Sequence, residues 1–274
     1  MTADLHTHTY YSDGLSSPRD LVQKAREVGL TQIAITDHDA IEGIAEAEEE
    51  GKRLGIRIIP GIELSADISG TEVHLLGYFV RYQNGAMQKS LGELKVAREN
   101  RVRKIAKNLS DSGVRIRADD IFAQTGKGSV GRPHVARALI ALGAARDLRD
   151  AFARFLVPGK PGYVSHDHLN GEEAIALIHA AGGVSVLAHP VTGGGEETIP
   201  ELVRMGLMGL EVYYENYTLE QVRRLEKIAG ENGLVKTGGS DYHGEGGRSR
   251  PVFLGSVKLE DNIVEVLEDA ARSR

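Results

Sequence analysis

The segment Asp4-Leu5-His6-Thr7-His8, close to the beginning of the chain, carries three metal-ligand side chains at alternate positions. Alternate side chains of an extended strand share a face, so Asp4, His6 and His8 are expected to point to the same side. A carboxylate and two imidazoles that converge in this way make half of a metal site. Chance clustering is the alternative, and the choice depends on whether further ligands follow.

Further ligand-type side chains recur along the chain where predicted strands end, and one lies inside a predicted strand. Together with the first two histidines they form one candidate set: His6, His8, Asp13, His38, Glu63, His74, His189, Asp241 and His243. Nine ligands are too many for one ion and suit two or three. The sequence therefore predicts a centre with more than one metal ion.

The chemistry of the expected ions follows from the ligand types. The chain of 274 residues has no cysteine, which excludes disulfides and thiolate zinc sites, so His, Asp and Glu alone would hold the metal. Such nitrogen and oxygen ligands suit manganese, iron, zinc or cobalt and do not distinguish sharply between them.

Alternating strands and helices are predicted around these ligands. The strands are expected near residues 4–8, 32–35, 56–64, 73–78, 184–188, 209–213 and 234–237, and most of them precede a segment with helical spacing of its apolar residues. The first helix should start after Ser17 as N-cap, with Pro18 in its first turn, and end at Gly29. This order favours a parallel β/α barrel or a close relative, in which functional groups collect at the carboxyl ends of the strands.

An interruption separates the fourth and fifth predicted strands. Residues 84–164 show helical spacing and no convincing strand, so we expect an inserted helical subdomain there, with residues 1–83 and 165–274 forming the barrel. Between residues 93 and 154, fourteen Lys and Arg accompany seven Asp and Glu, although the whole chain has a net charge of −6. A solvated helical face is the ordinary explanation of such an excess, but it also suits an anionic substrate.

Six motifs together resemble the signature of the polymerase and histidinol phosphatase (PHP) superfamily. They are Asp4-x-His6-x-His8, Ser12-Asp13-Gly14, Thr36-Asp37-His38, Gly61-Ile62-Glu63, Ala188-His189-Pro190 and Ser240-Asp241-x-His243. The resemblance is strongest to the stand-alone metal-dependent phosphoesterases, which include nucleoside 3′,5′-bisphosphate phosphatases and short-oligonucleotide 5′ exonucleases. That branch has a helical insertion at the same place, with a Gly-Arg-Pro-His and a Gly-Lys-Pro sequence, here 131–134 and 159–161. The resemblance implies a distorted seven-stranded (β/α) barrel.

The resemblance also implies a trinuclear centre. The ligands that the resemblance implies are His6, His8 and Asp241 for the first ion, His74 and His189 for the second, and Asp13, His38 and His243 for the third. The resemblance also implies that Glu63 bridges the first two ions. Manganese is the expected ion, with iron or zinc as substitutes. Asp4 is interpreted as a group that orients a histidine, and Asp37 or Asp39 as groups that orient ligands or relay a proton.

The implied activity is hydrolysis of phosphomonoesters of small nucleotides by a metal-activated water. The alternatives are a 5′–3′ exonuclease on short RNA or DNA, a histidinol phosphatase, and an inactive PHP module that serves only as a structural element. A complete set of nine ligand-type side chains disfavours the last alternative.

Three residues of the insertion are the candidates for substrate binding. Arg132 can bind a phosphate through its planar fork, Lys160 can add a charge, and His134 can donate a hydrogen bond. The alternative for Arg132-Pro133 is the start of a helix, which is compatible with phosphate binding. The segment 126–129 lacks the spacing of a phosphate-binding P-loop and is interpreted as a turn.

Other polar and aromatic residues have less specific interpretations. His179 is expected to be packed on a helix, and His166 and His168 to lie at the surface or near the substrate without binding metal. The tyrosines at 10, 11, 213, 214 and 217 are expected to pack at the core or rim, although each could stack on a base. With no apolar run of eighteen residues and no leader-like amino terminus, the default expectation is a cytoplasmic protein without a membrane or an obligatory protein partner.

Overall fold

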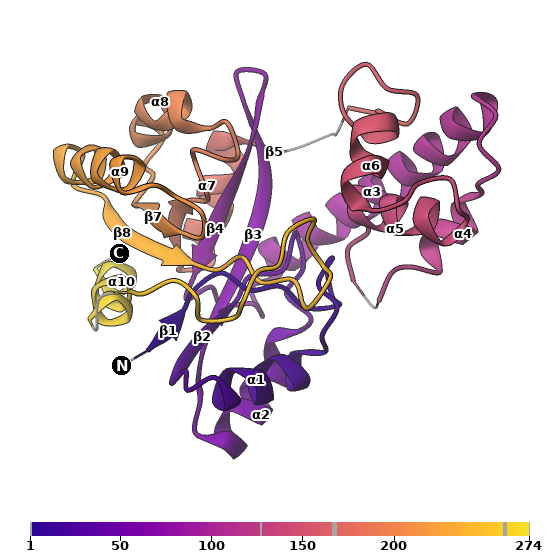
Figure 1. The fold of residues 1–274 in the computed structure, drawn as a ribbon. Helices are drawn as coiled ribbons and strands as arrows, with labels where there is room; N and C mark the ends of the chain where they lie inside the picture. The colour runs from indigo at the N-terminus through magenta and orange to yellow at the C-terminus, as the bar shows by residue number, and fades with distance from the viewer. Residues whose placement is uncertain (1, 127, 166–168, 260–261, 274) are drawn as a thin grey trace.

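The computed structural model describes residues 2–126, 128–165, 169–259 and 262–273, and its main body is a curved sheet surrounded by helices (Figure 1). The sheet order is β1-β2-β3-β4-β6-β7-β8, with β5 paired to β3. The strands are β1 (Ala3–Asp4), β2 (Gln32–Ile35), β3 (Arg57–Ile68), β4 (Thr71–Tyr78), β5 (Leu169–Asn170), β6 (Val184–Leu187), β7 (Gly209–Tyr214) and β8 (Val235–Gly239).

The two ends of this strand path meet just beyond β1 and β8. The Thr7 backbone forms a parallel bridge with Tyr242, and the His8 amide donates to the Tyr242 carbonyl at 2.9 Å. The seven described strands of the path therefore form a nearly closed barrel, which confirms the predicted distorted seven-stranded β/α barrel. The contact also brings the beginning and the end of the ligand set together.

One detail of the expected barrel was wrong. Strand β4 is antiparallel to both neighbours, β3 and β6, whereas the other pairs on the path are parallel. The reason lies in the two-residue connection between β3 and β4, where Ser69 and Gly70 have φ values of 51° and 90°. A connection this short closes only an antiparallel hairpin.

The helices begin and end largely where the sequence indicates. Ser17 caps the first helix by accepting a hydrogen bond from the Asp20 amide at 3.0 Å, and Gly29 follows the helix with φ of 82°. The helices of the barrel are α1 (Pro18–Glu27), α2 (Ile44–Leu54), α7 (Gly171–Ala180), α8 (Ile199–Arg204), α9 (Leu219–Glu231) and α10 (Ile263–Arg272), with a 3₁₀ turn at Glu196–Thr198. None of the described helices is long and apolar enough to cross a membrane. A cytoplasmic location stays a prediction.

The inserted segment is helical and lies to one side of the barrel (Figure 1). Its elements are α3 (Gly85–Asp111), α4 (Ala118–Phe122), α5 (Arg132–Ala141), α6 (Leu148–Ala151) and a π-helical turn (Phe152–Leu156). The residues from Val102 to Leu156 that are buried in it form a hydrophobic cluster of their own. The boundaries proposed at 84 and 164 stay a prediction.

Helix α3 belongs to both parts. Met87, Leu91 and Leu94 in its first half pack into the barrel core, whereas Val102 and Leu109 in its second half pack into the inserted cluster. One continuous helix therefore connects the two hydrophobic cores.

Candidate metal centre

The nine predicted ligands converge at one end of the barrel. Most follow the carboxyl end of a parallel strand, while Glu63 lies within β3 and His74 within β4. The backbone turns sharply at two of these strand ends, where His189 and Asp241 have φ values of 28° and 58°. Four overlapping groups of ligand atoms, each within 4.8 Å of one another, include all nine residues: His8, Asp13, His38 and His243; His6, His189 and Asp241; His6, His8 and Glu63; and His38, Glu63 and His74.

Glu63 lies at the centre of the convergence, and its two oxygens face different histidines. Its Oε2 lies 3.2 Å from Nε2 of His6, from Nε2 of His8 and from Nδ1 of His38. Its Oε1 lies 2.9 Å from Nδ1 of His74 and 3.0 Å from Nε2 of His189. One carboxylate thus has the geometry to bridge two ions.

The Asp13 carboxylate faces two of the candidate ligands, His243 and His38. Its Oδ1 lies 3.1 Å from Nε2 of His243 and 4.0 Å from Nε2 of His38. Asp241 approaches the first group instead, with Oδ1 3.2 Å from Nε2 of His8. The ligands around Asp13 therefore adjoin those around Glu63. His8 connects the two groups, because its Nε2 faces Asp241 and its Nδ1 lies 3.9 Å from Oδ1 of Asp13.

Several ligand atoms in this cluster are buried but make no hydrogen bond within the described part of the chain. They are Nε2 of His8, Oδ1 of Asp13, Nδ1 of His38 and Oδ1 of Asp241. Buried polar atoms are normally paired, so four orphans in one place indicate an absent partner. Ligands bound at about 2.0–2.2 Å to one ion stand roughly 3–3.5 Å apart, as many of these atoms do. The donor set fits divalent metal ions.

The protonation of the cluster without metal supports this fit. Burial lowers the pKa of His8 to about 4, helped by the neighbouring His243. Burial also opposes charge on His6, but Glu211 and Glu63 outweigh it and raise the pKa of His6 to about 10. The surplus of negative charge therefore holds a proton on His6, which a divalent ion would displace.

Glu211 is a functional residue that the sequence analysis missed. It lies fully buried on β7, where Oε1 accepts from Nδ1 of His6 at 2.9 Å and Oε2 accepts from the His189 amide at 2.6 Å. These bonds orient the ring of one candidate ligand and the backbone of another. The available signal was a glutamate inside the apolar run Gly209-Leu210-Glu211-Val212.

Glu211→Gln is expected to weaken metal binding by about 10–100-fold without removing a ligand, because an amide oxygen orients His6 less strongly than a carboxylate. Titration of the metal-free protein with Mn²⁺ measures the change. Glu196→Gln, which removes only the charge that faces Arg224 at 2.6 Å on the surface, is the matched control and should bind like wild type. Equal affinity in all three proteins would refute the role of Glu211.

The acidic residues beside the ligands have structural partners. Asp4 accepts from the amide and hydroxyl of Ser240 at 2.9 and 2.6 Å, and from the His6 amide at 3.3 Å. Asp4 thus holds the backbone at His6 and before Asp241, whereas Glu211 contacts the His6 ring, and the interpretation of Asp4 as a group that orients a histidine stays a prediction. Asp39 accepts from Arg98 on α3 at 2.7 Å.

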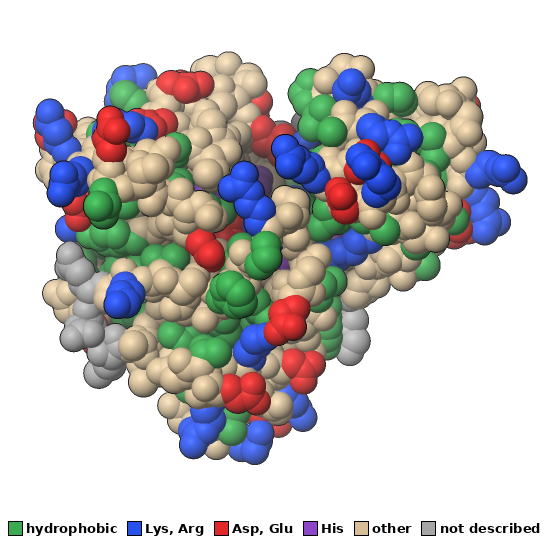
Figure 2. All heavy atoms as spheres, viewed as in Figure 1, with side chains coloured by type: hydrophobic (Ala, Val, Ile, Leu, Met, Phe, Trp, Pro, Cys, Tyr) green, Lys and Arg blue, Asp and Glu red, His purple; other side chains and the backbone are tan. Residues whose placement is uncertain are grey.

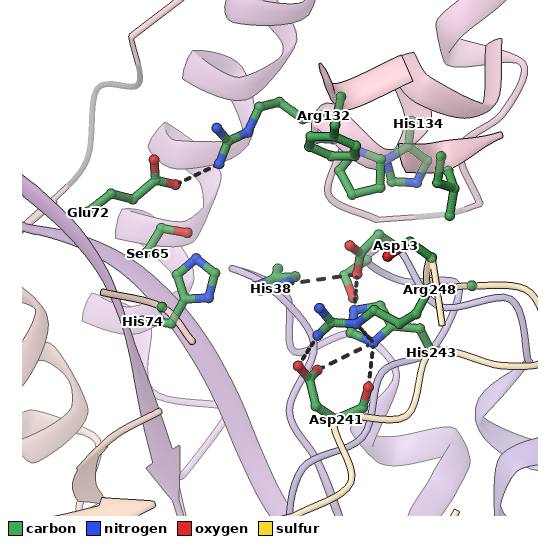
Figure 3. Close-up of a pocket in the computed structure, with 18 of the residues that line it drawn as sticks. Asp13, His38, Ser65, Glu72, His74, Arg132, His134, Asp241, His243 and Arg248 are labelled. Carbon is green, nitrogen blue, oxygen red and sulfur yellow. Dashed lines mark hydrogen bonds and ion pairs between the residues drawn. The ribbon is translucent and has the colours of Figure 1, made fainter. Parts of the chain in front are cut away.

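A cavity of about 610 Å³ opens over the ligand cluster, between the barrel and the inserted helices. Figure 2 shows histidines at the bottom of a hollow that has Lys and Arg side chains around it. In Figure 3, Arg132 and His134 lie across this cavity from Asp13, Asp241 and His243. The size suits a small organic ligand.

Of the three predicted substrate residues, two line this cavity. Arg132 is the first residue of α5, as the helix-start interpretation requires, and its Nη2 pairs with Oε1 of Glu72 at 3.1 Å. The ring of His134 is buried and its Nδ1 accepts from the Gly131 amide at 3.0 Å, while burial lowers its pKa to about 4. Lys160 is exposed on a turn and does not line the cavity.

Two residues that line the cavity contact candidate ligands, and the sequence analysis did not predict these contacts. Arg248 contacts the Asp241 carboxylate, and its Nε lies 3.2 Å from Nδ1 of His243. The Tyr214 hydroxyl donates to Oδ2 of Asp241 at 2.7 Å, whereas packing or stacking on a base was expected of it. His179 is packed as predicted, with Nε2 3.0 Å from the Ser185 hydroxyl. His166 and His168 lie outside the described residues.

Comparison with known proteins decides the family. The family model of the PHP domain matches residues 4–128. A 3′,5′-nucleoside bisphosphate phosphatase of Chromobacterium violaceum is 33% identical over 253 residues, or 89% of each chain. This chain belongs to the PHP family.

Two further relatives agree with this membership. A 5′–3′ exoribonuclease of Haemophilus influenzae is 34% identical to the PHP protein over 97% of each chain. The structure of a Bifidobacterium adolescentis protein, assigned as a metal-dependent phosphoesterase, superposes with a TM-score of 0.88 at 34% identity and covers 97% of this chain and 94% of its own. The expectation of a metal-dependent phosphoesterase is confirmed.

Proposed function

We propose that this PHP protein removes a phosphate from small nucleotides, such as nucleoside 3′,5′-bisphosphates, at a centre of three divalent ions. One observation carries the proposal: a single cavity has the cluster of metal-type ligands on one wall and buried arginines on another. A substrate with an ester phosphate and a second anionic group would fit between these walls. The C. violaceum relative, named as a 3′,5′-nucleoside bisphosphate phosphatase, supports this substrate class.

The positive wall is centred on Arg101, which lines the cavity although the residue is only 8% exposed. Its Nε donates to the Val164 carbonyl at 3.0 Å, and Glu72, which pairs with Arg132, is the carboxylate whose charge acts on it. Burial and the neighbouring charge of Arg132 lower the pKa of Arg101 to about 10, so the side chain still carries its charge at neutral pH. A buried positive charge of this kind is stabilised by an anion from outside the chain.

The ions would be held in three adjacent places. The proposed ligands are His6, His8, Glu63 and Asp241 for the first, Glu63, His74 and His189 for the second, and Asp13, His38 and His243 for the third. Divalent ions there would neutralise phosphoryl oxygens and lower the pKa of water toward neutrality. Manganese suits this set, with iron or zinc as substitutes. Metal analysis should find three ions per chain, and fewer than three after supplementation with manganese would contradict the three-ion centre.

The protein's own groups would orient the substrate. Arg132 can offer two parallel N–H groups to a phosphate at the start of α5, where the helix end also favours an anion. Arg248, which contacts Asp241 and His243, lies on the ligand side of the same cavity and can approach a phosphate bound there. The predicted role of Lys160 in binding a phosphate stays a prediction, and the residue lies outside the cavity.

Arg132→Ala is expected to raise KM by about 10–100-fold with metal content intact, because a hydrogen bond to a charged group contributes about 1.5–3 kcal/mol. Steady-state kinetics with adenosine 3′,5′-bisphosphate measures the change. Arg117→Ala removes an exposed arginine of the same insertion that lies 3.5 Å from Asp120, and should leave KM unchanged. An unchanged KM in Arg132→Ala would refute its assignment to substrate.

A panel of three substrates tests the proposed function. Release of inorganic phosphate from adenosine 3′,5′-bisphosphate is compared with release of nucleotides from a 5′-phosphorylated oligonucleotide and of phosphate from histidinol phosphate. We expect the highest kcat/KM for the bisphosphate. The exonuclease is the second candidate because the H. influenzae relative bears that name, and a higher kcat/KM for the oligonucleotide would favour it.

A further inference from the structure

The loop that carries Asp13 lies between the barrel and the inserted helices. On the barrel side Asp37 holds the loop, because Oδ1 accepts from the Thr9 amide at 2.7 Å and from the Ser12 hydroxyl at 2.6 Å. A second bond joins the Thr9 hydroxyl to Oδ2 of Asp37 at 2.6 Å. These bonds fix the beginning and middle of the loop but do not reach Asp13 itself.

Inserted residues bind the same loop from the other side, and they do so at three successive backbone carbonyls. The donors and acceptors are the Ser129 amide to Tyr11 at 2.7 Å, the His134 ring to Ser12, and the Arg137 guanidinium to Asp13. Because Nδ1 of His134 already accepts from the Gly131 amide, both ring nitrogens are used within the protein. His134 is therefore better placed to hold the loop than to bind substrate.

The packing between the insertion and the loop leaves no room for side chains. A Cβ at Gly128 would come within 1.7 Å of the Tyr11 carbonyl oxygen, and a Cβ at Gly126 within 2.2 Å of the Tyr10 carbonyl oxygen. Both distances are far below a van der Waals contact, so glycine is needed at these positions for the two backbones to approach.

The carboxylate of Asp13 is the part of this loop that faces the ligand cluster. Oδ1 of Asp13 lies 3.1 Å from Nε2 of His243, is buried, and has no hydrogen-bond donor among the described residues. The bond from Arg137 to the carbonyl of Asp13 fixes the backbone to which that carboxylate is attached. The position of one candidate ligand thus depends directly on an inserted helix.

We propose that the inserted helices are part of the metal centre, with Arg137 of α5 positioning Asp13 so that the third ion can bind. His134 and Ser129 position the two preceding residues of the loop. All three are positioning residues, since they touch the backbone of the loop and not a ligand atom. The inference rests on the three-ion centre of the proposed function and adds to it that the third ion is bound only when the insertion is docked on the loop.

Metal content tests the inference without relying on activity. Wild type, Arg137→Ala and Arg137→Lys are loaded with Mn²⁺, freed of excess ion and analysed for manganese per chain. We expect three ions in wild type and two in Arg137→Ala, with the apparent Kd of the third ion raised by about 10–100-fold. Arg137→Lys should retain the third ion, because an ammonium group can donate to the same carbonyl. Arg146→Ala, which removes only an exposed partner of Asp150, is the control and should hold three.

Each alternative result has a definite meaning. Three equally tight ions in Arg137→Ala would overturn the inference and leave the proposed function intact, and loss of all ions from folded Arg137→Ala would overturn it as well. If Arg137→Ala fails to fold, His134→Phe decides by the same criterion, because it removes the bond to the Ser12 carbonyl. Fewer than three ions in wild type would refute the three-ion centre itself, and the inference with it.

Discussion

Glu63→Gln is expected to lower kcat by at least about 10³-fold, which corresponds to about 4 kcal/mol in the activation free energy. The side chain is 1% exposed, and its two oxygens face different histidines at 2.9–3.2 Å, three at Oε2 and two at Oε1. Glutamine keeps the shape but has one oxygen, and its NH₂ group cannot bind a cation. One of the two proposed ions that share this carboxylate should therefore be lost, which metal analysis would detect as a lower ion content.

The control for this change is Glu226→Gln. Glu226 accepts from the Tyr213 hydroxyl at 2.9 Å and does not line the cavity, so kcat and metal content should stay within about twofold of wild type. If Glu63→Gln retained a tenth of the wild-type kcat with the full complement of ions, Glu63 would not be the bridge between two ions.

Arg98→Met should lower the free energy of unfolding by about 3–5 kcal/mol, as is typical when one partner of a buried ion pair is removed. The Arg98 side chain is 9% exposed, and the Asp39 carboxylate that it meets is 1% exposed. Arg98 also donates to the Ser65 hydroxyl at 3.2 Å and to the Val130 carbonyl at 3.3 Å. Methionine has a similar length but leaves the carboxylate of Asp39 buried without its counter-charge.

Denaturant unfolding at neutral pH measures this loss. Lys107→Met is the matched control, because it removes an equally long cation from an exposed pair with Asp111 on the same helix and should change stability by less than about 1 kcal/mol. A comparably small change in Arg98→Met would show that Asp39 tolerates burial without this partner.

The sequence predicts that the candidate ligands converge, because their positions follow from local rules. His6 and His8 alternate on an extended segment, and His38, His189 and Asp241 follow predicted strands, so strand ends alone bring them to one edge of the sheet. The antiparallel direction of β4 was missed, because only the short turn at Ser69 and Gly70 encodes it.

The partners of the ligands could not be predicted in the same way. Glu211 meets His6 across 205 residues of sequence, and Arg137 meets Asp13 across 124. Such pairs form only when the barrel closes and the inserted helices pack against it, and the spacing of residues along the sequence predicts neither of these events. Arg101 and Arg98 were part of a basic segment in which each charge had the same ordinary interpretation. Only burial separates these two arginines from the exposed ones around them.

Because α3 runs without a break through both hydrophobic cores, its direction fixes how the inserted helices lie relative to the barrel. From Arg98, near its middle, to its end at Asp111 the helix extends over about 20 Å, so a difference of about 5° in its direction at Arg98 would displace that end by roughly 2 Å. The guanidinium of Arg98 donates to the Asp39 carboxylate of the barrel at 2.7 Å, and this bond anchors the middle of the helix. Arg101 lies on the same helix three residues beyond Arg98, so the anchor that fixes α3 at Asp39 also fixes where this buried charge stands over the cavity.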